Sequence, residues 1–312
     1  KLKIDFFINI YNNLGSVLIV NGKQNEHYIY EIQHVRRRET IAMTPANCHT
    51  ALLALIKNST FTISPSKLEL NKKIVTDEII TITGAKTMPL IGSSGLSMQY
   101  AIMMGLVDFA QENHQGKPIK FIVPPNCYGG TNDQARRVAA CIKNVEVIDL
   151  HVDRENDMTQ SIDVILDEIA IQNAVPFIIA EIPTNPRVEV PDLKQLKTVL
   201  EKKRKTTLSG DAISPVFVLD QTFCPNTPFL DSVELFSKVK AISYVSGSKF
   251  PSGGQCTAGY CVGNKKTISL MLKIDKHLSI CDNQATDLQY EILAKQLPSM
   301  NQRIFDAYQN TR

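Results

Sequence analysis

Short apolar runs alternate with segments of helical periodicity from about residue 75 to residue 265. The apolar runs are continuous, which is typical of strands that are buried on both faces of a sheet. They occupy residues 121–123, 145–150, 176–182, 216–220 and 241–245. This alternation predicts an α/β fold with a mainly parallel central sheet and helices on both faces.

The segments between these runs have the spacing of amphipathic helices. Residues 159–172 place their isoleucine and leucine side chains on one face. Residues 192–205 begin at Asp192, which suits an N-cap, and end on basic residues. Further helices are predicted at residues 93–110, 134–143, 268–278 and 286–308, and an edge strand is predicted at residues 257–262.

The 312-residue chain divides into three parts by pattern. Residues 1–70 carry mixed short patterns to which no structure is assigned. Residues 71–265 are predicted to form the large domain that contains the alternating strands and helices. Residues 266–312 are predicted to be the helical start of a C-terminal domain.

Composition limits the classes of function. A hydrophobic content of 43% and a charged content of 21% are ordinary for a globular protein. A net charge of +3 does not indicate a nucleic-acid partner, and the basic residues 36–38 are interpreted as solvated. The apolar residues 6–20 are interrupted by polar residues and Gly15, so they are a weak membrane or signal candidate.

The cysteines and histidines predict neither disulfides nor a metal site. Seven cysteines are present without a CxxC pair, and the six histidines lack the spacing of metal ligands. We therefore expect reduced thiols and a cytoplasmic protein.

An amine and a carboxylate stand at the ends of two successive predicted strands. Asp220 ends one apolar run, and Lys249 follows small hydroxyl residues after the next. The carboxyl ends of parallel strands meet at the edge of the sheet where ligands bind. A lysine there can form an imine with a carbonyl cofactor, and the carboxylate can pair with a ring nitrogen. This arrangement suits pyridoxal 5′-phosphate (PLP).

Three further motifs are each open to two interpretations. Residues 93–98 (SSGLSM) begin a helix whose free amides could bind phosphate, although such a start is more often only a cap. In residues 126–131 (NCYGGT), a tight turn could hold Tyr128 over a flat cofactor or place it on the surface. In residues 181–186 (EIPTNP), Asn185 could donate to a ring oxygen, or the segment is only a rigid turn.

Five motifs occur in an order that resembles a known family. SSGL, CYGGT, PTNP, VLDQTF and SGSK are similar to SSGM, LYGGT, PTNP, DNTF and S-x-T-K of the PLP-dependent enzymes of cysteine and methionine metabolism. These are the cystathionine γ-synthases, cystathionine lyases and methionine γ-lyases. The resemblance covers about residues 75–265 and implies the PLP-dependent transferase fold (aspartate aminotransferase-like, fold type I).

Carried over position by position, the resemblance implies roles for individual residues. Lys249 would hold PLP as a Schiff base and shuttle the Cα proton, Asp220 would pair with the pyridine nitrogen, and Tyr128 would stack on the ring. The implied cofactor-binding residues are Gly95, Leu96, Tyr128, Asn185, Asp220, Thr222, Ser246, Ser248 and Lys249.

The resemblance implies trans-sulfuration chemistry, which is elimination or replacement at Cβ or Cγ of a sulfur-containing amino acid. It also implies a homodimer or homotetramer that has neither a nucleic acid nor a membrane as partner. Leu96 in place of the usual Met and Ser248 in place of the usual Thr are mild departures from the family. Larger departures are Asp133, which stands where many members carry arginine, and the absence of a tyrosine-x-arginine sequence from the first 90 residues. The alternatives are a diverged protein of this fold without family catalysis, another PLP reaction such as transamination, and an unrelated α/β phosphate-binding protein.

Overall fold

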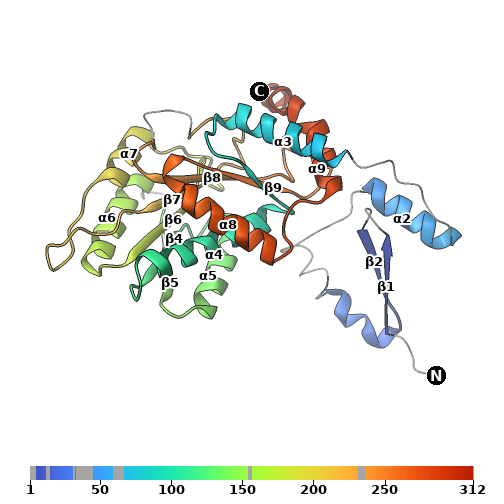
Figure 1. Cartoon of the computed structure of the whole chain (residues 1–312), viewed down its shortest axis with the longest axis horizontal. Coiled ribbons are helices and arrows are strands. Elements are labelled where there is room, and N and C mark those ends of the chain that lie inside the picture. Colours follow the sequence, from blue (N-terminus) through green and yellow to red (C-terminus); the bar gives the residue numbers. More distant parts are fainter. Residues whose placement is uncertain are drawn as a thin grey trace.

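A seven-stranded sheet runs through the centre of the molecule, as the computed structural model in Figure 1 shows. The structure describes residues 5–11, 15–30, 32, 45–58, 67–153, 157–230 and 236–311. The strand order is β3-β9-β8-β7-β6-β4-β5. The strands are β3 (Leu90–Gly92), β4 (Ile119–Val123), β5 (Val145–Asp149), β6 (Val175–Glu181), β7 (Val216–Asp220), β8 (Lys240–Ser246) and β9 (Gly259–Gly263).

The sheet is mainly parallel, which confirms the predicted fold class. Strands β5, β4, β6, β7 and β8 run parallel, whereas β9 is antiparallel to both β8 and β3. The prediction that residues 257–262 form an edge strand was wrong, because β3 pairs with the far side of β9. Strand β3 has only three residues, which is too short for a periodic pattern to reveal it.

Helices cover both faces of the sheet, and each face has its own hydrophobic core. On one face lie α4 (Gly95–Asn113), α5 (Gly129–Cys141) and α8 (Ile268–Ile280), which bury side chains against alternate residues of the strands. On the other face lie α6 (Met158–Ile171) and α7 (Leu193–Glu201). Adjacent strand residues therefore belong to opposite cores: Ile178 to the α6–α7 side, and Phe177 to the α4 side.

A third core joins segments from the two ends of the alternating region. Helix α3 (Leu68–Thr83) packs against α9 (Asp287–Gln296) and α10 (Met300–Asn310) through buried aliphatic side chains. The long helix predicted at residues 286–308 is interrupted by a 3-10 turn that contains Pro298. The domain division at residue 265 stays a prediction, although α8 shares a core with α4 across it.

The N-terminal elements lie to one side of the main sheet (Figure 1). Strands β1 (Phe6–Tyr11) and β2 (Gly15–Val20) form an antiparallel pair, and α2 (Pro45–Lys57) follows. Residues 36–38, the basic cluster of the sequence, lie outside the described residues. Among the helices that the structure describes, none is long and apolar enough to cross a membrane.

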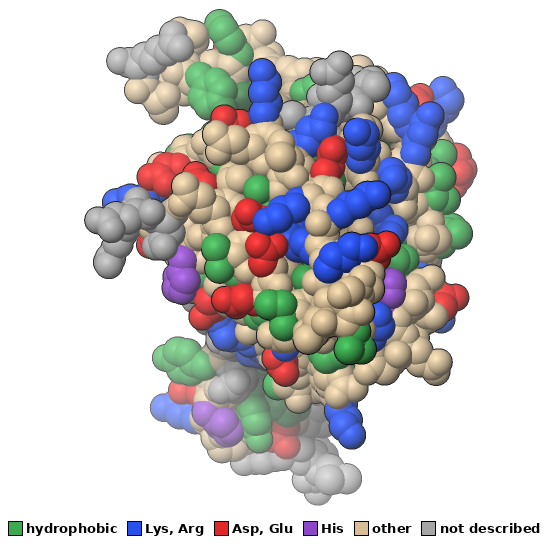
Figure 2. All heavy atoms as spheres, turned by 90° about the vertical axis from the view of Figure 1, so that its left-hand side faces the viewer, with side chains coloured by type: hydrophobic (Ala, Val, Ile, Leu, Met, Phe, Trp, Pro, Cys, Tyr) green, Lys and Arg blue, Asp and Glu red, His purple; other side chains and the backbone are tan. Residues whose placement is uncertain are grey.

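Charged side chains of both signs share the surface over α6 and α7. Figure 2 shows basic and acidic groups interspersed on this side of the molecule. Lys202 lies 2.8 Å from Asp163 and 3.0 Å from Asp167, and Lys205 lies 2.6 Å from Asp211. This face is therefore a network of ion pairs rather than a patch of one sign.

Candidate functional site

A pocket opens at the carboxyl ends of β6, β7 and β8, beside the start of α4. Its empty space is about 790 Å³, the open mouth included. The lining residues are Gly95, Leu96, Gln99, Tyr128, Glu181, Asn185, Asp220, Thr222, Phe223, Tyr244, Ser246, Ser248 and Lys249. Every residue that the sequence predicted for a cofactor lies in this lining, so the structure brings the whole predicted set together.

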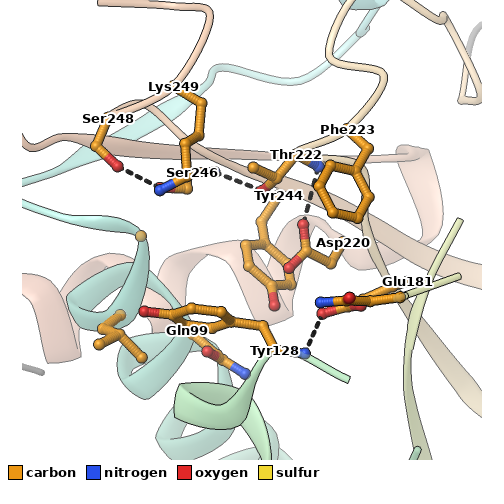
Figure 3. Close-up of a pocket in the computed structure, with 13 residues that line it drawn as sticks. Gln99, Tyr128, Glu181, Asp220, Thr222, Phe223, Tyr244, Ser246, Ser248 and Lys249 are labelled. Atoms are coloured by element: carbon orange, nitrogen blue, oxygen red, sulfur yellow. Dashed lines mark hydrogen bonds between the residues drawn. The ribbon is translucent and has the colours of Figure 1, made fainter. Parts of the chain in front are cut away.

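Neighbouring strands place three polar side chains in one row across the pocket floor. Glu181 of β6 is in register with Asp220 of β7, which is in register with Tyr244 of β8. Residues that are opposite one another on paired strands point to the same face of a sheet. All three are buried, and Figure 3 shows their side chains lying together. We call Glu181, Asp220 and Tyr244 the acidic row.

Asp220 is held at the centre of the acidic row by hydrogen bonding and charge. Its Oδ1 accepts a hydrogen bond from the backbone N–H of Thr222 at 2.9 Å. Burial raises the pKa of the Asp220 carboxyl, and the Thr222 hydrogen bonds, the Tyr244 hydroxyl and the charge of Lys249 oppose that rise. Lys249 and Asp220 both line the pocket, and the charge of Lys249 acts on the Asp220 carboxyl.

Glu181 is a second acid in the same pocket. Its Oε1 accepts a hydrogen bond from the backbone N–H of Tyr128 at 2.6 Å, while its Oε2 is buried without a partner among the described residues. Burial, and then the negative charge of Asp220, raise the pKa of Glu181 to about 7. Glu181 is therefore partly protonated at neutral pH.

The start of α4 forms an anion-binding corner of the pocket. Ser94 caps the helix by accepting a hydrogen bond from the Ser97 N–H at 3.0 Å. The amides of Gly95 and Leu96 lie in the first turn, where an α-helix offers no intrahelical acceptor. A Cβ at Gly95 would lie 2.8 Å from the Ser246 Cβ, so only glycine allows the helix to approach β8 this closely.

Hydroxyl groups at the end of β8 and in the segments that follow β7 and β8 complete this corner. The Ser246 and Ser248 hydroxyl oxygens lie 2.9 Å apart, and the Thr222 hydroxyl accepts a hydrogen bond from the Ser246 N–H at 2.9 Å. Lys249 follows at the mouth of the pocket. Together with the α4 amides, these donors suit a phosphate group.

Tyr128 and Asn185 occupy the loops at the mouth of the pocket. Tyr128 directly precedes α5 and remains 49% exposed. A Cβ at Gly130 would lie 2.6 Å from the Tyr128 ring, whereas a Cβ at Gly129 would meet no atom within 4 Å. Of the two glycines in the YGG turn, Gly130 is therefore the one that the ring requires.

The sequence did not predict four of the lining residues. They are Gln99, Glu181, Phe223 and Tyr244. The carboxylate of Glu181 at the end of a buried run was a usable signal, but the register that sets Tyr244 beside Asp220 cannot be read from one segment. Asp133 is not part of the lining; it lies on α5 and its carboxylate is 2.9 Å from the Arg137 guanidinium.

Comparison with known proteins shows which fold this is. No protein-family model and no curated protein sequence matches the chain. Solved structures do match over 74% of it. One is a cystathionine gamma-lyase from yeast, which is 18% identical, is covered over 50% of its length and has a TM-score of 0.55. A cystathionine gamma-lyase from Micromonospora echinospora is 17% identical, is covered over 52% of its length and has a TM-score of 0.54. A cystathionine gamma-synthase from Xanthomonas oryzae pv. oryzae in complex with cystathionine is 15% identical, is covered over 51% of its length and has a TM-score of 0.53.

These likenesses establish the fold and leave the individual roles as predictions. The chain has the fold of the fold type I, PLP-dependent transferases, as the sequence predicted. It spans about half the length of these solved structures.

Proposed function

We propose that this chain is a PLP-dependent enzyme of the trans-sulfuration type. It would catalyse elimination or replacement at Cβ or Cγ of a sulfur-containing amino acid. The observation that carries this proposal is the convergence of Lys249, Asp220 and the α4 N-terminus in one pocket. Support comes from the solved structures of this fold, which are titled as cystathionine gamma-lyases and a cystathionine gamma-synthase.

The donor set of the pocket fits PLP at each of its functional groups. The free amides of Gly95 and Leu96 and the paired hydroxyls of Ser246 and Ser248 suit the phosphate. Among the described residues no cation lies within ion-pair distance of the buried Asp220 carboxylate, although the charge of Lys249 acts on it, and a protonated ring nitrogen would provide that close partner. A side chain at position 95 would collide with Ser246 and fill the space where the phosphate would lie.

Each residue of the pocket would have its own role in binding PLP or in moving a proton. When bound, PLP supplies an electron sink for the substrate Cα. The Lys249 amine would hold the cofactor, and afterwards accept the Cα proton and return it. Asp220 would keep a proton on the ring nitrogen, because an opposite charge in a buried site favours the charged form. Tyr128 would cover one face of the ring and exclude water, and Asn185 would donate to the ring hydroxyl.

The first experiment tests the lysine. Protein purified with added PLP is reduced with borohydride, and its peptides are analysed by mass spectrometry. We expect a pyridoxyl label on the Lys249 peptide in the wild type and no label in Lys249→Ala. Lys276→Ala, which removes an exposed lysine of α8, is the matched control and should keep the label. A wild type that takes up no PLP would count against the proposal.

The second experiment tests the reaction. Release of a keto acid from cystathionine, homocysteine, cysteine or methionine would identify a lyase, and condensation of cysteine with an acylated homoserine would identify a synthase. We expect one of these activities and its loss in Lys249→Ala. Transfer of the amino group to a keto acid would assign the transamination alternative, and PLP binding without turnover would assign a non-catalytic protein.

A further inference from the structure

Three buried polar atoms in the lining residues of the pocket have no hydrogen-bond partner in the described part of the chain. They are the Gln99 Nε2, the Glu181 Oε2 and the Tyr244 hydroxyl. Buried polar groups in native proteins are almost always paired, and an unpaired one carries its full desolvation cost. Their concentration at one pocket therefore indicates that the site uses them.

Contacts connect these atoms into one polar layer below the pocket. The Thr131 hydroxyl lies 3.4 Å from the Gln99 Oε1 and is close enough to Tyr244 to affect its pKa. Figure 3 shows the Tyr244 ring beside Asp220, with its hydroxyl directed toward Gln99 and Glu181. The carboxylates of Asp220 and Glu181 are the charged acceptors that face this hydroxyl.

We propose that Tyr244 is a positioning residue. Its hydroxyl donates a hydrogen bond to the buried pair of Asp220 and Glu181 and so stabilises the ionised form of these carboxylates, which line the pocket. The hydroxyl has no partner by geometry, yet it lies near enough to Asp220 to lower the pKa of that carboxyl. One part of this inference rests on the proposed function, namely that Asp220 is the partner of a cofactor ring.

The titratable groups around the pair come from several elements. Besides Tyr244 and Lys249, they are the thiols of Cys127, before α5, and Cys224, after β7. Burial raises the pKa of Cys127 to about 12 and that of Cys224 to about 11, so both thiols stay neutral between pH 5 and 9. Burial also raises the pKa of Tyr244 well above its usual value. Changes in charge among these acids in that range therefore belong to Asp220 and Glu181.

The substitution Tyr244→Phe removes the hydroxyl and keeps the ring. Tyr260→Phe is the matched control, because Tyr260 is equally buried, its hydroxyl also lacks a partner, and it does not line the pocket. Loss of the Tyr244 hydroxyl should raise the pKa of the acidic pair further. An acid whose pKa is raised in the folded state loses stability as pH rises through that pKa. The deficit of Tyr244→Phe should therefore grow with pH.

The first measurement is the melting temperature of the protein without cofactor from pH 5.5 to 8.5. We expect the deficit of Tyr244→Phe to increase by about 2 °C or more over this range, and that of Tyr260→Phe to stay constant. A Tyr244→Phe deficit that is equal at every pH would show a packing role only and would overturn the proposal. So would a variant as stable as the wild type throughout.

The second measurement is the PLP affinity of the same proteins, determined by titration at pH 5.5 and at pH 8.5. Tyr244→Phe should weaken binding roughly ten- to hundredfold, the size of one hydrogen bond to a charged group, and Tyr260→Phe should not change it. The loss should be larger at pH 5.5, because more of the Asp220 carboxyl is then protonated. A pH-dependent stability deficit together with unchanged PLP affinity at both pH values would reject the role in cofactor binding. If the wild type itself bound no PLP, the proposed function would fail, while the melting experiment would still decide whether Tyr244 stabilises the acidic pair.

Discussion

The carboxyl edge of the central sheet and the N-terminal strand pair depart from the usual arrangement of side chains in opposite ways. At the sheet edge, Glu181 and Asp220 are buried at the ends of apolar strands. In the strand pair, Phe7 is 44% exposed and Ile8 is 64% exposed. The first region buries polar groups, and the second exposes apolar ones.

The difference teaches what each departure requires. Burial of a carboxylate costs several kcal/mol unless a partner compensates it, so the sheet edge needs a ligand or an internal donor. Partial exposure of an aliphatic side chain costs only about 25 cal/mol per Å², and single exposed apolar residues are common. Only the first region therefore carries strong evidence of function from its side chains alone.

Asp220→Asn tests the sheet edge most severely. The amide keeps the shape and removes the charge that a protonated ring nitrogen would need. We expect PLP affinity to fall by roughly 10²–10³-fold, the effect of breaking a buried charge pair. The protein without cofactor should become more stable at pH 8, because burial raises the pKa of Asp220 and a neutral side chain avoids that desolvation cost.

Asp306→Asn is the control for these two opposite effects of Asp220→Asn, weaker PLP binding and higher stability without cofactor. Asp306 accepts a hydrogen bond from Gln302 on the exposed face of α10, away from the pocket. Its substitution should leave PLP affinity unchanged and stability nearly so. If Asp220→Asn lowered stability without cofactor and bound PLP normally, Asp220 would be a structural residue, and the contrast with the strand pair would disappear.

Glu181→Gln tests whether the second acid titrates inside the fold. Its pKa is raised from 4.5 to about 7, so the wild type should lose stability as pH rises through this interval, by roughly 3 kcal/mol. Glutamine can still accept the hydrogen bond from the Tyr128 N–H but cannot ionise. We therefore expect Glu181→Gln to be the more stable protein at both pH values, with an advantage that is about 2 kcal/mol larger at pH 8.5 than at pH 5.5.

Urea unfolding at the two pH values measures this difference. Glu291→Gln, which changes an exposed glutamate of α9, should follow the wild type at both values. Asp220 is close enough to act on Glu181, so the difference between Glu181→Gln and the wild type measures the ionisation of the coupled pair, whereas Glu291→Gln leaves that pair intact. Parallel pH profiles for Glu181→Gln and the wild type would mean that Glu181 is already ionised in the folded protein, contrary to its burial.

The central strands β4, β6, β7 and β8 could be predicted because burial on both faces makes them largely apolar. Motifs at strand ends then predicted Lys249 and Asp220 together, since parallel strands end at one edge. Strand β3 was missed because three residues carry no period, and the break at Pro298 was overlooked inside a helical pattern. Tyr244 was missed because its place beside Asp220 depends on the register between strands, which one sequence does not contain.

The N-terminal strand pair was not predicted for a different physical reason. Strand β1 has apolar residues at adjacent positions, FFINIY, instead of the clean alternation of a strand with one face in water. Strand β6 (VPFIIAE) also has apolar residues at adjacent positions, but it is completely buried, because helices cover both faces of that strand. A sequence pattern thus predicts burial only when the elements that cover it are also known.

The smallest expected effect comes from Ile8→Thr in β1. Ile8 pairs with Leu18 of β2 and is 64% exposed, and threonine is also β-branched and so keeps the preference for a strand. We expect urea unfolding to change by less than about 0.5 kcal/mol. Ile178→Thr in β6 is the matched substitution at a fully buried position, and it should cost about 2–4 kcal/mol, since it removes packing and buries a hydroxyl. Comparable losses at the two positions would mean that Ile8 is covered in solution, and the strand pair would then have to be treated as a buried surface.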